Sequence, residues 1–169
     1  IELENGLGLL LRQAALIWLA SVFAFFFLLI GFIDDTRRLG PITKLLAFSL
    51  FAIAIAITMG VVDKLPFGHG VEWKLGLSLG LFGTALWVFT MVNTVNFMDG
   101  ANGLSLGSTA IGIVSLGAIA LDHDIAMAAA ICFCAAGAIG GFLVWNFPNG
   151  RIFAGDSGAL FAGAIAAIA

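Results

Sequence analysis

The chain has 169 residues, of which 62% are apolar and only 10% are charged, and it contains 16 Phe but no Tyr. Its mean hydropathy of +1.14 lies far outside the range of soluble globular domains. The net charge of −3 and the scattered basic residues argue against a nucleic-acid-binding protein. The composition therefore predicts an integral membrane protein whose fold class is all-α, a polytopic transmembrane helix bundle.

Five apolar stretches are long enough to cross a hydrocarbon core that is about 30 Å thick, since a helix rises about 1.5 Å per residue. In chain order we expect these helices at about 7–33, 44–62, 75–95, 104–121 and 125–145. A last apolar run of 11 residues, 159–169, could not span and is expected to be a truncated sixth span. Residues 1–169 are expected to form a single transmembrane domain, the central part of a longer protein.

Polar connections separate the expected helices, and consecutive spans must leave the membrane on alternate sides. The first, third and fifth connections should therefore share one face. They carry the candidate chemistry: Asp34, Asp35, Asn96, Asp99, Asn102, Asn146 and Asp156. The opposite face is expected to hold 63–74, with His69, and the tight turn Asp122-His123-Asp124.

Basic residues are slightly more numerous on the face that carries these motifs. That face has Arg37, Arg38, Lys44 and Arg151, against Arg12, Lys64 and Lys74 opposite. By the positive-inside rule, this excess favours a cytoplasmic location for the motif face.

Clustered aspartates repel one another unless a cation neutralises them. The two cysteines, Cys132 and Cys134, lie inside an apolar run, so oxygen ligands dominate, and these select Mg²⁺, or Mn²⁺, over zinc. Glycines flank Asp99 and Asp156, which allows backbone to approach a phosphate closely. Metal-assisted phosphoryl transfer at the membrane interface is the chemistry that this pattern favours.

Each motif taken alone has a structural alternative. Asp34 and Asp35 with the neighbouring arginines could form surface ion pairs, and Asp99 or Asp156 could cap a helix. Lys44 could be a snorkelling lysine. Three glycine pairs at i and i+4, beginning at Gly76, Gly103 and Gly137, predict close helix packing.

The motifs taken together resemble a known family, the polyprenyl-phosphate N-acetylhexosamine-1-phosphate transferases, which include phospho-N-acetylmuramoyl-pentapeptide transferase. The resemblance rests on Asp34-Asp35 with Lys44-Leu45, on Asn96-Phe97-Met98-Asp99-Gly100-Ala101-Asn102-Gly103-Leu104, and on Asn146-Phe147-Pro148 with Phe153-Ala154-Gly155-Asp156-Ser157-Gly158. The chain corresponds to the central half of a family member of about ten helices.

The resemblance implies an enzyme that transfers sugar-1-phosphate from a UDP-N-acetylhexosamine to undecaprenyl phosphate, releases UMP and requires Mg²⁺. It also implies an inner-membrane location in bacteria, with a role in starting cell-envelope polysaccharides, and leaves a homodimer open. The peptidoglycan-branch activity is the alternative.

The resemblance also implies roles for individual residues. Asp34, Asp35 and Asp99 are the catalytic candidates, with Asp34 nearest the lipid phosphate. Lys44, Asn93, Asn96 and Asn146 are the substrate-binding candidates, with Lys44 binding phosphate, and Asp156 is the Mg²⁺ ligand.

The sequence also departs from the family pattern. Asn102 stands where many members have a second Asp, which leaves a metal role there in doubt, and Ala159 replaces a common Ser. A His-containing loop expected further on is absent, and parity places His69 and His123 on the wrong face to replace it. The 169-residue chain alone is therefore predicted to be inactive.

Two rival functions come from other classes of protein. An ion or proton transporter would place Asp and Asn near mid-span on broken helices, whereas here they lie at the ends of unbroken spans. A noncatalytic membrane scaffold would need none of these motifs.

Overall fold

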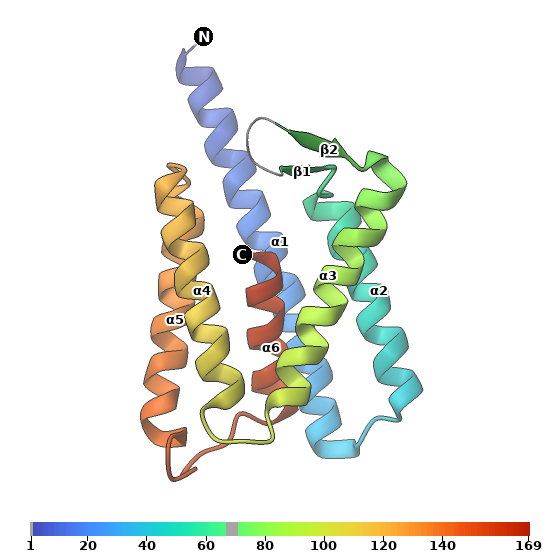
Figure 1. Ribbon diagram of the computed structural model, residues 1–169, viewed down its shortest axis with the longest axis vertical. Helices are drawn as coiled ribbons and strands as arrows, with labels where there is room; N and C mark the ends of the chain where they lie inside the picture. Colours follow the sequence, from blue (N-terminus) through green and yellow to red (C-terminus); the bar gives the residue numbers. More distant parts are fainter. Residues whose placement is uncertain (1, 67–70) are drawn as a thin grey trace. The chain divides into compact units, whose positions relative to one another are not determined.

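The computed structural model describes residues 2–66 and 71–169, so His69 lies outside the described residues. Within these ranges the chain forms six helices and a short hairpin (Figure 1). The helices are α1 (Glu2–Arg37), α2 (Pro41–Met59), α3 (Gly76–Met98), α4 (Leu104–Asp122), α5 (Ala126–Asn146) and α6 (Gly155–Ile168), and the strands are β1 (Lys64–Pro66) and β2 (Glu72–Lys74).

Five of these helices are long and apolar enough to span a membrane, and α6 is the shorter apolar helix. The all-α transmembrane fold predicted from composition is therefore confirmed. Large apolar side chains such as Trp18, Phe82 and Ile111 are exposed along the spans, as expected for surfaces that face lipid.

The chain divides into two compact units. The first contains Ile1–Arg38 and Met91–Ala169, and the second contains Leu39–Thr90, so that the boundary falls within α3. The prediction of one domain over residues 1–169 is not tested by this division. The motif residues, apart from Lys44, all belong to the first unit.

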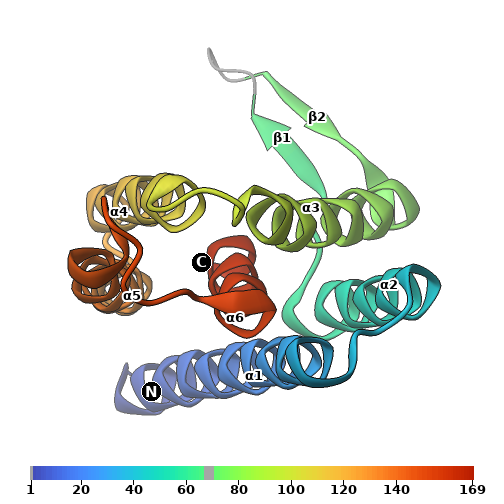
Figure 2. The ribbon, with the colours of Figure 1, turned by 90° about the horizontal axis from the view of Figure 1, so that it is seen from below.

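In the first unit, α6 lies between α1 on one side and α4 with the end of α3 on the other (Figure 2). Five of its residues are alanines, and Ala159, Leu160 and Ala164 are fully buried. A Cβ added at Gly163 would lie 3.0 Å from the Cα of Val92 on α3. Small side chains therefore let α6 pack closely against its neighbours, as is usual between membrane helices.

Two boundaries differ from expectation and move the motifs from loops onto helices. α1 continues through Asp34 and Asp35 to Arg37, and Arg38 then ends it with a left-handed φ of 46°. The Thr36 hydroxyl donates to the carbonyl oxygens of Phe32 (2.9 Å) and Ile33 (3.0 Å), so the polar turn stays helical.

At the other motif, Gly155-Asp156-Ser157-Gly158 forms the first turn of α6, where a loop was expected.

In the second unit, Gly40 and Pro41 begin α2 as its N-cap and first residue, a position that proline favours. The connection after α2 contains an antiparallel hairpin in which Lys64 pairs with Lys74 and Pro66 with Glu72. No sequence pattern indicated this hairpin, because each strand has three exposed residues and no apolar alternation.

The prediction that the three glycine pairs mediate close packing between helices is wrong within the described part of the chain. Gly76, Gly107, Gly137 and Gly141 have no atom within 4 Å of an added Cβ. The other two glycines of these pairs meet connecting segments: a Cβ would lie 2.9 Å from the Val62 carbonyl oxygen at Gly80 and 2.6 Å from the Phe147 ring at Gly103. Close approach between helices occurs at other glycines. In particular, a Cβ on Gly31 of α1 would lie 2.5 Å from backbone atoms of Asp156 and Ser157.

This contact predicts that Gly31→Ala destabilises the protein by about 1–3 kcal/mol, because the opposing atoms are backbone and cannot rotate away. Gly137→Ala is the matched control, since it enters open space in a helix and should change the stability by no more than about 1 kcal/mol. Thermal unfolding of the whole protein in detergent micelles measures both. Equal unfolding temperatures for the two variants would contradict the α1–α6 contact.

Candidate active site

Asp156, in the first turn of α6, connects three segments that are far apart in the sequence. The side-chain amide of Asn96 on α3 donates to Asp156 Oδ1 at 2.9 Å. The backbone N–H of Asp156 donates to Asp35 Oδ1 of α1, also at 2.9 Å. The end of α1, the end of α3 and the start of α6 therefore meet at this residue.

Asp35 caps α6 from a different helix. Its carboxylate accepts the N–H groups of Asp156 and Ser157 (3.1 Å) and the hydroxyl of Ser157. These N–H groups belong to the second and third residues of α6 and have no partner within that helix. A carboxylate offers about four acceptor positions, so three of them are filled by α6.

Asp34, the preceding residue, is in a different environment. Adjacent residues on a helix project about 100° apart. The Asp34 side chain is buried, at 7% exposure, whereas Asp35 is exposed. The two neighbouring carboxylates are therefore inequivalent, although the sequence presents them as a pair.

Asp99 follows the end of α3 and is part of the same electrostatic cluster. Its pKa is raised above the ordinary value, first by partial burial and then by the negative charges of Asp156 and Asp35. The Asp99 carboxyl group therefore lies within electrostatic reach of Asp156 and Asp35. The structure thus brings together the aspartates that the sequence assigned to different connections.

Asn146 links the connection that follows α3 to the connection that follows α5 through hydrogen bonds. Its Oδ1 accepts the Gly103 N–H at 2.7 Å, its Nδ2 donates to the Ile152 carbonyl oxygen at 2.8 Å, and the side chain is 7% exposed. Gly103 has a φ of 74°, and a Cβ there would lie 2.6 Å from the Phe147 ring. Only glycine fits this junction.

Both polar groups of the Asn146 amide are thus used within the protein, and its substrate-binding role stays a prediction. Asn102, the position where many family members have Asp, also joins these connections: its Nδ2 donates to the Pro148 carbonyl oxygen at 3.3 Å.

The other two predicted binding residues, Asn93 and Lys44, are placed by their positions on α3 and α2. Asn93 is one turn before Asn96 on α3, so the two amides lie on one face of the helix. Lys44 is in the first turn of α2 and belongs to the second unit, so its role at this site also stays a prediction.

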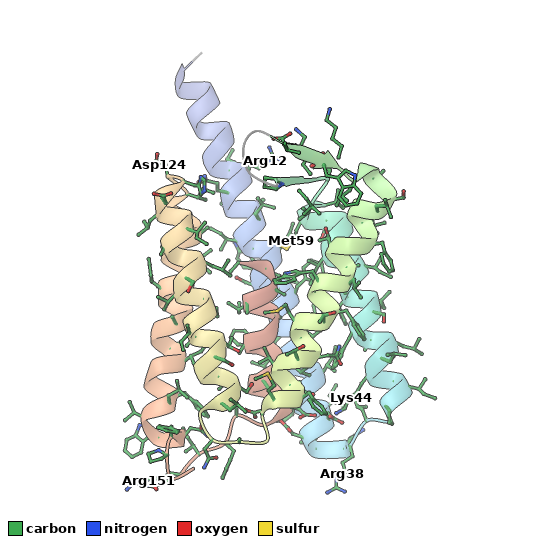
Figure 3. All side chains as sticks on the ribbon, in the orientation of Figure 1. Arg12, Arg38, Lys44, Met59, Asp124 and Arg151 are labelled. Atoms are coloured by element: carbon green, nitrogen blue, oxygen red, sulfur yellow. The ribbon has the colours of Figure 1, made fainter. Side chains whose placement is uncertain are left out.

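Within the first unit, the motif residues gather at one end of the helices. Figure 3 shows Arg38 and Arg151 at this end and Asp124 at the opposite end. The Arg151 guanidinium lies 5.9 Å from the centre of the Trp145 ring. The predicted sharing of one face is confirmed for the α1, α3 and α5 ends, and nothing tests whether that face is cytoplasmic.

The donor set fits Mg²⁺ when a substrate completes it. Among the described residues, no three His, Cys, Asp or Glu side chains form a group that could hold a metal by themselves. Mg²⁺, however, is usually bound by one or two carboxylates together with substrate phosphates. Asp99 feels the negative charges of Asp156 and Asp35, and a divalent cation beside Asp156 would lower this repulsion.

Sequence reasoning missed Gly31 and the role of Ser157. Gly31 lies four residues before Asp35, so both are on the face of α1 that meets α6. The only signal was a glycine inside an apolar helix, which by itself indicates no partner.

Comparison with known proteins identifies the family of the chain. Residues 17–169 match the family model described as glycosyl transferase family 4. The chain is 32% identical over 146 residues to the probable undecaprenyl-phosphate N-acetylglucosaminyl 1-phosphate transferase of Bacillus subtilis, covering 85% of this chain and 40% of that protein.

Two further relatives differ in the acceptor or donor that their names give. The decaprenyl-phosphate N-acetylglucosaminephosphotransferase of Mycobacterium leprae is 36% identical, and the match covers 83% of this chain and 38% of that protein. The phospho-N-acetylmuramoyl-pentapeptide-transferase of Listeria monocytogenes is 32% identical, and the match covers 92% of this chain and 52% of that protein. The chain spans about half or less of these relatives, and its match over nearly its whole length shows that it belongs to glycosyl transferase family 4.

Proposed function

We propose that the whole protein transfers N-acetylhexosamine-1-phosphate from a UDP-sugar to a polyprenyl phosphate, with undecaprenyl phosphate as the expected acceptor. UMP is released, and the lipid-linked product starts a cell-envelope polysaccharide. The observation that carries this proposal is the convergence on Asp156, which bonds Asn96 and Asp35 and lies within electrostatic reach of Asp99. The names of the relatives support the chemical class.

In this reaction an oxygen of the lipid phosphate attacks the phosphorus that bears the sugar. The bond from that phosphorus to the UMP oxygen breaks, and UMP leaves with the bonding electrons. Both reactants are anions, so the main demand on the site is to neutralise charge and to align the two phosphates. A bound Mg²⁺ would supply most of the neutralisation.

The residues of this chain would divide these tasks. Asp156 would hold Mg²⁺, with its side chain oriented by Asn96. Asp34 is proposed to orient the lipid phosphate or take its proton. A phosphate monoester has its second pKa near 6, so little of it carries that proton at neutral pH, which favours orientation as the main task.

The location follows from the same arrangement. The helix ends that carry the aspartates also carry Arg38 and Arg151, which favours the cytoplasmic side of a bacterial inner membrane. The lipid acceptor would reach the site from the bilayer and the nucleotide-sugar from the cytosol.

A second candidate is the peptidoglycan-branch activity. The observation that favours it is the Listeria relative, a phospho-N-acetylmuramoyl-pentapeptide-transferase that matches 92% of the chain. Incubating the whole protein with undecaprenyl phosphate and a panel of UDP-sugars separates the two by the donor that releases UMP. We expect a UDP-N-acetylhexosamine to be used, and turnover confined to an unacetylated hexose donor would contradict both candidates.

Asp156→Asn should lower Mg²⁺-dependent UMP release by the whole protein at least about a hundredfold, because the metal loses its anionic ligand. The protein should still fold, since the amide oxygen can accept the bond from Asn96. Asp122→Asn is the matched control: it is exposed at the opposite end of α4 and should leave the rate unchanged. Equal rates for both variants, or a rate that does not depend on Mg²⁺, would refute the assignment.

The raised pKa of Asp99 leads to a stability prediction. A carboxyl group with a raised pKa favours the folded state at low pH, and this contribution is lost as the pH rises through the raised value. In metal-free buffer at pH 7, Asp99→Asn should therefore raise the unfolding temperature, with the gain shrinking as the pH falls toward the ordinary value of 3.8.

Mg²⁺ should raise the unfolding temperature of the wild type more than that of the variant, because the ion relieves the same repulsion. Differential scanning fluorimetry in detergent, with Asp122→Asn beside it, measures both effects. The prediction is wrong if Asp99→Asn is less stable than the wild type at pH 7 in the presence of a chelator. The Asp99 carboxylate would then stabilise the fold by more than its burial and its repulsion by Asp156 and Asp35 destabilise it.

A further inference from the structure

We propose that Asp35 is a positioning residue: from the end of α1 it holds the first turn of α6 in place, and through that turn it sets Asp156 against Asn96. This inference rests on the proposed function and reassigns one member of the Asp34-Asp35 pair. Asp35 then acts on the reaction through Asp156 rather than on the lipid phosphate itself.

The first step is that α6 has no cap from its own sequence. Its N-cap residue is Ala154, and no side chain at that position bonds the helix. The first N–H groups of a helix have no acceptor within that helix and need one from outside it. The Asp35 carboxylate, 121 residues earlier in the chain, accepts the N–H groups of both Asp156 and Ser157.

The second step is that the backbones of α1 and of the first turn of α6 lie in close contact. Gly31 lies one turn before Asp35 and is buried, and a Cβ there would strike the Asp156 carbonyl group. Gly155 has a φ of 64°, and a Cβ there would lie 2.8 Å from Asp35 Oδ2. We call Gly31, Asp35 and Gly155 the α6 seat. Together they place the first turn of α6 against the end of α1, with close backbone approach at the two glycines and hydrogen bonds at Asp35.

The third step links the seat to the chemistry. Ser157 donates both its N–H and its hydroxyl to Asp35 Oδ2, so the carboxylate is held by charge-assisted bonds in a fixed orientation. Asp156 is fixed at its backbone by the seat and at its side chain by Asn96. A loss of the seat would therefore misplace the proposed metal ligand without removing any group that touches substrate.

The test uses the whole protein and the variants Asp35→Asn, Ser157→Ala and their double mutant. An amide in place of the Asp35 carboxylate keeps one acceptor oxygen and turns the other into a donor that faces an N–H group, so one of the two backbone N–H groups loses its acceptor. Hydrogen–deuterium exchange of the peptide that contains Asp156 and Ser157, measured in metal-free protein, should become about five- to thirty-fold faster in Asp35→Asn. Asp34→Asn and Asp122→Asn should leave this exchange unchanged.

The kinetic readout separates positioning from direct catalysis. In Asp35→Asn we expect kcat to fall with KM for the lipid phosphate unchanged, and Ser157→Ala to add little when combined with it, since both remove the same contact. Fold-losses that multiply in the double mutant, or a raised KM for the lipid, would show that Asp35 acts on the substrate and overturn the proposal.

Two further outcomes are decisive. If Asp35→Asn fails to fold, Ser157→Ala is the milder test, and it must speed exchange of the same peptide for the proposal to hold. Unchanged exchange in both variants would overturn it. Absence of UMP release by the wild-type protein would refute the proposed function, while the exchange measurement would still decide whether the α6 seat exists.

Discussion

The hydrogen bonds between the Asp35 carboxylate and the first turn of α6 connect the two ends of the described chain. They link residues that are separated by 121 and 122 positions in the sequence, at the place where α1, α3 and α6 meet. Without them, the first N–H groups of α6 would have no acceptor from the cap position of that helix. The position of Asp156 therefore depends on a residue of α1 as much as on its own local sequence.

This arrangement concentrates negative charge. The N-terminus of α6 carries roughly half a positive charge, which compensates part of the charge of Asp35 and Asp156. Asn96 supplies a further donor to Asp156. The pKa of Asp99 is raised, first by its partial burial and then by the negative charges of Asp156 and Asp35. A site that gathers carboxylates in this way suits the proposed binding of a metal together with a phosphorylated substrate.

Small residues make the arrangement possible inside a membrane protein. Lipid tails are as apolar as the helix surfaces, so burial of apolar area drives helix association weakly, and close backbone contact has to replace it. Gly31 against α6 and Gly163 against α3 provide that contact. The glycine pairs that the sequence presented as packing motifs provide no such contact between helices, because contact depends on which residue faces a neighbour, and spacing along one helix does not reveal this.

The sequence by itself determined the transmembrane class, the number of long spans, the shared face of the three motifs and the family, since each follows from apolar length, alternation of sides or local residue order. Only the tertiary structure decided that Asp34 and Asp35 are inequivalent, that Asp156 begins a helix, and that Asn146 fastens two loops. The physical reason is that caps, burial and charge repulsion depend on residues from other helices. A linear pattern shows which side chains are available, but their partners are fixed only when the helices pack.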